Sequence, residues 1–73
     1  MLAAGGEVQA SKAAVRVLMD LAEAVMAEVA EKARMLAIHA GRKRVLERDV
    51  VEACRLLGLE RFLARAQASS STS

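Results

Sequence analysis

The chain has 73 residues and a formal net charge of +2, and 55% of its residues are hydrophobic. This length allows one domain, and the apolar content excludes a disordered chain. The single cysteine, Cys54, excludes an internal disulfide, and together with one histidine it is too few ligands for a zinc site. We therefore expect no metal and no cofactor. No membrane-spanning stretch and no signal-peptide pattern is found, so we expect a cytoplasmic protein with no membrane partner.

The first ten residues are predicted to form a short N-terminal segment with at most one helical turn, near residues 2–4. Gly5 and Gly6 disfavour a continuous helix there. Ser11 follows, and serine is a favoured residue at the position that caps the start of a helix. The main domain is therefore predicted to begin at Ser11.

Residues 12–40 form the clearest element, a long helix marked by apolar residues at steps of three or four. At ~1.5 Å per residue it would be about 43 Å long, which exceeds the width of a compact domain of this size. The rest of so short a chain cannot cover it, and we therefore expect a second chain to cross it in at least a dimer. The expected dimer core consists of Leu18, Leu21, Val25, Val29, Leu36 and Val50.

Two shorter helices are predicted beyond this one, which makes the fold all-α. Gly41 ends the long helix, and a second helix runs from about residue 47 to residue 57 before Gly58. A third amphipathic helix covers residues 59–68. The domain would then span residues 11–68, and the serine-rich residues 69–73 are predicted to be a disordered tail.

Three consecutive cations, Arg42, Lys43 and Arg44, lie in the connection between the first two helices. Such a loop adds little to a core, and its clearest use is to present positive charge to a polyanion. The alternative is an ordinary solvated surface loop. The sequence contains no nucleophile–base pair, no glycine-rich phosphate loop and no metal-ligand cluster, so we expect neither an enzyme nor a small-molecule substrate.

The run from Ser11 to about Leu57 resembles the archaeal-type histone fold. The residues that carry the resemblance are Ser11 at the start of the long helix, the run from His39 to Lys43, and Asp49-Val50 in the next helix. In that family two chains interlock in a handshake dimer, in which the long central helices cross. The resemblance therefore implies an all-α histone fold and an intertwined dimer.

The resemblance also implies roles for the residues of the basic loop. Arg42 and Asp49 match an arginine–aspartate clamp that holds this loop against the following helix. Lys43 matches a cation that contacts DNA phosphates. Arg44 lies where the family usually has threonine, so this loop is more basic than the family's.

Further implied roles concern the helix ends. Gln9 lies where the family usually has an arginine that enters the minor groove. His39 and Asp49 match positions at which dimers stack into larger assemblies. The free N–H groups near Ser11 and Lys12 offer another anion site, and a handshake dimer would bring them beside the partner's basic loop.

The chain departs from the family at both ends. The family has a first helix of about ten residues where this chain has only residues 1–10, two of which are glycine. The family also lacks the extra helix that is predicted in this chain over residues 59–68. We therefore expect this extra helix to replace the packing role of the missing one.

These inferences predict a protein that binds double-stranded DNA through its phosphates with little sequence specificity. It would compact, bend or coat the chromosome as a nucleoid-associated homodimer, with a tetramer or larger assembly as an alternative. A second hypothesis is a heterodimerisation subunit of a transcription or chromatin complex, with minor DNA contact. A third is a purely structural helical oligomer whose basic loop is fortuitous.

Overall fold

The structure is a computed structural model of the chain, which describes residues 8–71, with side chains through residue 68. Over this range it contains three helices, α1 (Lys12–His39), α2 (Glu47–Leu56) and α3 (Glu60–Ser71), and no strand. The predicted all-α class is confirmed. The turn expected near residues 2–4 lies outside the described residues. The third helix continues to Ser71, into the segment expected to be a disordered tail.

The start of α1 follows from the side chain of Ser11. This residue adopts an extended backbone conformation, with φ −70° and ψ 163°, and its Oγ accepts a hydrogen bond of 3.0 Å from the N–H of Ala14. That bond satisfies one of the N–H groups that a helix leaves unpaired in its first turn. Residues 12–39 then form one uninterrupted helix.

Two glycines end α1 and α2 in the same way. Gly41 and Gly58 have φ values of 76° and 73°, a conformation that glycine adopts without steric cost. The N–H of Arg42 donates to the carbonyl of Ala37 at 2.9 Å, and the N–H of Leu59 donates to the carbonyl of Cys54 at 2.7 Å. These bonds define Schellman motifs, which satisfy the last carbonyls of each helix and fix the direction in which the chain leaves it.

The substitution Gly41→Ala is expected to lower the free energy of unfolding by about 1 kcal/mol because alanine is strained at positive φ. A Cβ atom at this position would meet nothing within 4 Å, so the cost lies in the backbone alone. Gly41→Asn should cost less, since asparagine tolerates this conformation. Thermal melting compares the two variants, and an alanine variant as stable as wild type would contradict the assignment.

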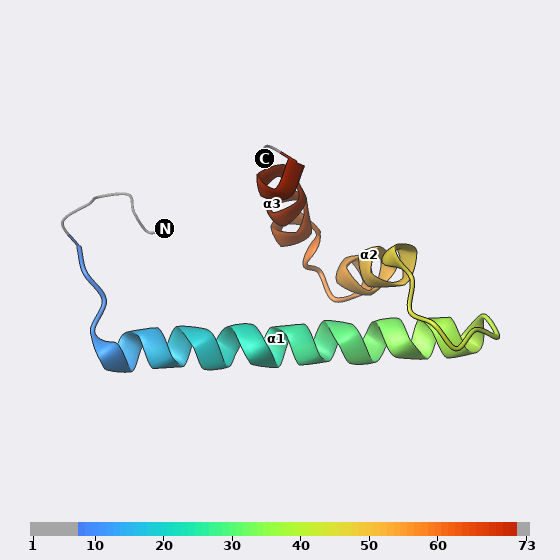
Figure 1. The fold of residues 1–73 in the computed structure, drawn as a ribbon, viewed down its shortest axis with the longest axis horizontal. Helices are drawn as coiled ribbons and strands as arrows, with labels where there is room; N and C mark the ends of the chain where they lie inside the picture. Colours follow the sequence, from blue (N-terminus) through green and yellow to red (C-terminus); the bar gives the residue numbers. More distant parts are fainter. Residues whose placement is uncertain (1–7, 72–73) are drawn as a thin grey trace.

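The core of the single chain is small and lies at one end of α1. Helix α2 lies along the C-terminal half of α1 (Figure 1), and the buried apolar residues are Ala33, Ala37, Ala53 and Cys54. In contrast, every residue from 12 to 28 is exposed. Helix α3 turns away from α1, and no Cα atom of α3 lies within 8 Å of one in α1 among the described residues.

This arrangement leaves the single chain extended. Its Cα radius of gyration is 15.2 Å, whereas a compact chain of this length would have about 11 Å. Its accessible surface is 6176 Å², whereas a compact protein of this mass would expose about 4400 Å². Among the described residues, large apolar side chains such as Leu18, Leu21 and Phe62 are more than half exposed in the single chain.

Candidate nucleic-acid interface

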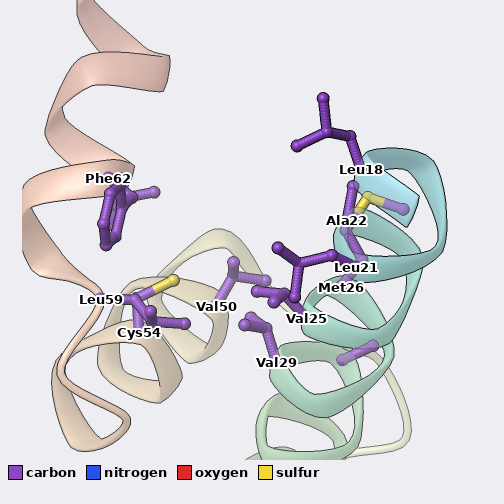
Figure 2. A pocket seen from close by; sticks show the side chains of 12 residues that line it. Leu18, Leu21, Ala22, Val25, Met26, Val29, Val50, Cys54, Leu59 and Phe62 are labelled. Atoms are coloured by element: carbon purple, nitrogen blue, oxygen red, sulfur yellow. The ribbon is translucent and has the colours of Figure 1, made fainter. Parts of the chain in front are cut away.

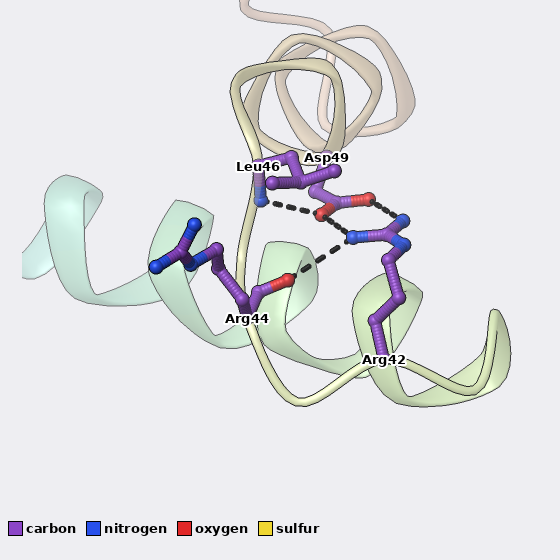
Figure 3. Close-up of polar contacts among 4 residues, drawn as sticks. All are labelled: Arg42, Arg44, Leu46 and Asp49. Carbon is purple, nitrogen blue, oxygen red and sulfur yellow. Dashed lines mark hydrogen bonds and ion pairs between the residues drawn. The ribbon is translucent and has the colours of Figure 1, made fainter.

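The loop between α1 and α2 is held by one bidentate ion pair. The Nη1 and Nη2 atoms of Arg42 donate to the two carboxylate oxygens of Asp49 at 2.7 and 2.8 Å (Figure 3). The same Nη1 also donates to the backbone carbonyl of Arg44 at 3.0 Å. Paired bonds of this kind fix orientation as well as distance. Arg42 thus holds the start of α2 and the middle of the loop at the same time.

Asp49 combines this role with capping of α2. Its carboxylate accepts a hydrogen bond of 2.7 Å from the N–H of Leu46, the residue that precedes the helix. Its side chain is only 5% exposed, whereas that of Arg42 is 25% exposed. The hydrogen bonds from Arg42 and then from Leu46 hold the pKa of Asp49 well below its ordinary value. The same pair raises the pKa of Arg42. Asp49 therefore stays ionised and keeps the loop and helix together.

The other two cations of the loop are free to bind a ligand. Lys43 and Arg44 are exposed, and neither side chain has a hydrogen-bond or ion-pair partner in the described part of the chain. Figure 3 shows the Arg44 side chain directed away from the clamp while its carbonyl is held within it. The loop therefore presents two cations on a backbone that is already fixed.

The remaining predicted DNA-contacting residues lie at the other end of the molecule. Gln9, Ser11 and Lys12 are all exposed, and they precede or begin α1. The basic loop follows the far end of this 28-residue helix, at a distance of about 42 Å. One chain therefore does not bring the two groups together. His39 is exposed in the last turn of α1, near the loop.

The predicted dimer-core residues divide into two groups. Leu18, Leu21 and Val25 are 55%, 57% and 38% exposed. Val29, Leu36 and Val50 are half-buried, because α2 lies beside that part of α1. The exposed group lines one side of an apolar groove of about 680 Å³ (Figure 2). Extended exposed apolar surfaces of this kind are typical of interaction sites.

The structure adds residues that the sequence did not identify as part of these surfaces. The groove is also lined by Leu59, Phe62 and Leu63 and by Cys54 of α2. Their spacing had predicted an amphipathic helix, but spacing alone did not show which surface that helix would face. In the clamp, the backbone carbonyl of Arg44 is a further acceptor.

Two other kinds of site are absent from the described residues. No helix there is both long enough and apolar enough to cross a membrane. No group of three or more histidine, cysteine, aspartate or glutamate side chains between residues 8 and 68 is placed to hold a metal ion.

Comparison with known protein families identifies a match to a family model. Residues 3–56 match the family described as the core histone domain, which covers all four kinds of core histone. The match includes α1, the basic loop and α2, and it ends before α3 begins. No curated protein and no solved structure matches the chain.

Proposed function

Because this chain belongs to the core histone family, we propose that it pairs with a second copy of itself and binds double-stranded DNA with little sequence specificity. Histone-fold proteins in general dimerise and bind DNA, and the family is non-enzymatic. The proposed dimer is the handshake arrangement, in which the two α1 helices cross near their midpoints. It would act on the chromosome by compacting, bending or coating it.

The observation that carries the DNA-binding proposal is the clamped loop with its two free cations. Lys43 and Arg44 are exposed and unpaired on a backbone that Arg42 and Asp49 hold in place. Fixed cations of this kind suit phosphate groups, whose contacts set position without reading sequence. The described surface offers no stacking aromatic beside them, since Phe62 lies on α3. Contact with the DNA backbone is therefore the binding mode that we propose.

Pairing explains why the candidate residues are divided between the two ends of α1. In a handshake dimer, the basic loop of one chain lies beside the start of the partner's α1. Each end of the dimer would then combine Arg42, Lys43 and Arg44 of one chain with Gln9, Ser11 and Lys12 of the other. The unpaired N–H groups at the start of α1 add to the attraction for phosphate. The dimer would thus have two equivalent DNA-binding ends.

A salt titration of DNA affinity tests this proposal. If each end neutralises about three phosphates, a plot of log affinity against log salt should have a slope of about −5. Lys43→Ala/Arg44→Ala removes four cations from the dimer, so its slope should fall to about −2 and its affinity should be lower at every salt concentration. Gel shift with duplexes of unrelated sequence provides the measurement.

The control variant is Arg61→Ala/Arg65→Ala, which removes the same number of charges from α3. Both arginines are exposed and lie outside the proposed DNA-binding ends. This variant should keep a slope close to that of wild type. Equal affinity of wild type and Lys43→Ala/Arg44→Ala would remove the DNA-binding proposal.

A heterodimerisation subunit is the second candidate function. The net charge is only +2, and Gln9 occupies a position at which related proteins would have a cation, which favours weaker DNA contact. In that case the apolar surface of α1 would pair with a different histone-fold chain. Sedimentation of the pure chain distinguishes a homodimer from a heterodimerisation subunit, because a chain that depends on another partner would aggregate or unfold alone.

For assembly beyond a dimer, we propose His39 rather than Asp49 as the contact residue. His39 is exposed, whereas the carboxylate of Asp49 is buried and already accepts hydrogen bonds on both oxygens. A contact through Asp49 would have to share or break the clamp.

A further inference from the structure

Helix α3 lies outside the residues that match the histone family, and in the single chain its apolar side is left largely uncovered. It packs against the end of α2 and stands away from α1. Phe62, the one aromatic residue of the chain, is 55% exposed on it. An isolated helix of 12 residues gains little stability by itself. The apolar side of α3 therefore needs a surface that covers it.

The apolar side of α3 faces the same open groove as the exposed part of α1. Leu59 and Phe62 lie on one wall of the groove, and Leu18, Leu21 and Val25 lie on the opposite wall (Figure 2). Leu63 of α3 also lines the groove. Val50 and Cys54 of α2 lie at its base. All twelve lining residues are apolar. The groove therefore suits an apolar helix and offers no partner to a charged ligand.

We propose that the α3 helix of each chain packs against the α1 helix of its partner and forms a second arm of the dimer interface. This inference rests on the proposed pairing of two copies and adds a contact outside the matched histone domain. The occupant of the groove is the middle of the partner's α1, near Val25. Phe62 and Leu63 then contact a helix of the other chain.

Continuity with the expected dimer interface is the first argument for this occupant. Val25 lies near the midpoint of α1 (Lys12–His39), where two crossing helices would meet. Val25 also lines the groove. A partner helix that crosses there therefore enters the space between α1 and α3, so the groove and the crossing point are one surface.

Symmetry is the second argument. A twofold dimer needs a surface that is complementary to itself, because the same residues contribute from both sides. Here one chain offers both the groove between α1 and α3 and an exposed apolar helix, α1, that can fill such a groove. When the α1 helix of each copy lies in the groove of the other, each α1 is covered on one side by the partner's α1 and on another by the partner's α3.

The substitution Phe62→Asp tests the arm. It places a charge in the proposed interface twice per dimer, and we expect the dimer to dissociate at least about 100-fold more readily. The matched control is Ala64→Asp, which adds the same charge to an exposed site of α3 two positions along, on another side of the helix. Analytical ultracentrifugation over a concentration series measures both.

Cross-linking identifies which α1 helix α3 contacts. Two chains are refolded together in the Cys54→Ala background, one with Ala22→Cys and a size tag, the other with Leu63→Cys. A short bismaleimide should give a covalent dimer that contains both chains. The complementary test uses one chain that carries both Ala22→Cys and Leu63→Cys, paired with a chain that carries neither cysteine. If this chain links within itself while the mixed pair stays unlinked, α3 folds onto its own α1 and the inference is wrong.

Failure of this inference can be told apart from failure of the proposed function. If wild type is a tight dimer and Phe62→Asp is equally tight, the pairing holds and the α3 arm is wrong. If wild type sediments as a folded monomer, both proposals fail. A dimer weakened by Phe62→Asp but not by Ala64→Asp, with the mixed cross-link formed, supports both.

Discussion

Val25→Lys is expected to leave the chain largely unfolded at micromolar concentration. In one chain Val25 is 38% exposed and the substitution would be tolerated, but in the proposed dimer this residue lies where the two α1 helices cross. Two unpaired ammonium groups would then be buried close together, and each costs several kcal/mol of unfolding free energy. Circular dichroism at 222 nm and sedimentation measure the loss of helix and of the dimer.

The control is Ala27→Lys. This residue is exposed on the same helix, two positions along, and so faces a different side. Lysine adds the same charge at both sites, and its helix propensity is higher than that of valine but lower than that of alanine, so propensity alone would favour the variant at position 25. At position 27 the lysine also lies four residues from both Glu23 and Glu31. Ala27→Lys should therefore remain a folded dimer. A folded Val25→Lys monomer would show that α1 needs no partner.

Asp49→Asn is expected to reduce both stability and DNA affinity. The substitution replaces an ionised acceptor of three hydrogen bonds with a neutral amide and leaves the Arg42 guanidinium without its counter-ion. Removing one partner of a buried pair is costly, and a fall in melting temperature of about 10 °C is expected. DNA affinity should fall as well, because the loop that carries Lys43 and Arg44 loses its anchor.

The control for this prediction is Glu52→Gln. Glu52 forms an ion pair with Arg55 at 2.7 Å, but the two side chains are 39% and 58% exposed. Exposed pairs contribute little to stability, so Glu52→Gln should melt close to wild type. If Asp49→Asn also melted like wild type, the clamp would have no structural role.

The pH dependence of the clamp has a definite sign. The pKa of Asp49 is lowered in the folded chain, so the folded state favours the ionised form. The contribution of Asp49 to stability is therefore complete above the ordinary aspartate pKa of about 4, and it declines as the pH falls below that value. The difference in melting temperature between wild type and Asp49→Asn should be constant from pH 7 to about pH 5 and should narrow below about pH 4.

The helices were predictable because their ends are set by local chemistry. Ser11 caps α1 through its own side chain, and Gly41 and Gly58 allow the positive φ that each helix end requires. Such signals can be read from a few neighbouring residues. The third helix was predicted too short because serine was taken as a tail residue, although no glycine or proline after Gly58 stops the helix. Serine is only a moderately weak helix former.

The relation of α3 to α1 was not predictable in the same way. The apolar spacing of Leu59, Phe62 and Leu63 predicted a face but not the surface that it meets. That surface depends on the angle at which the chain leaves Gly58 and on the placement of residues far apart in the sequence. For the basic loop, the residue types predicted that the side chains present positive charge to a polyanion. The acceptor role of the Arg44 carbonyl depends on backbone geometry, which the residue type does not specify.

The clamp holds position 44 by its main chain and leaves the side chain outside. Any residue that adopts the same backbone conformation would keep that bond, so stability places almost no demand on which residue stands there. The charge of each proposed DNA-binding end is therefore adjustable by single substitutions at this position, from arginine to a neutral or acidic residue, while the architecture stays constant. Single substitutions at position 44 could therefore change the affinity for the proposed nucleic-acid ligand during evolution while the fold remains the same.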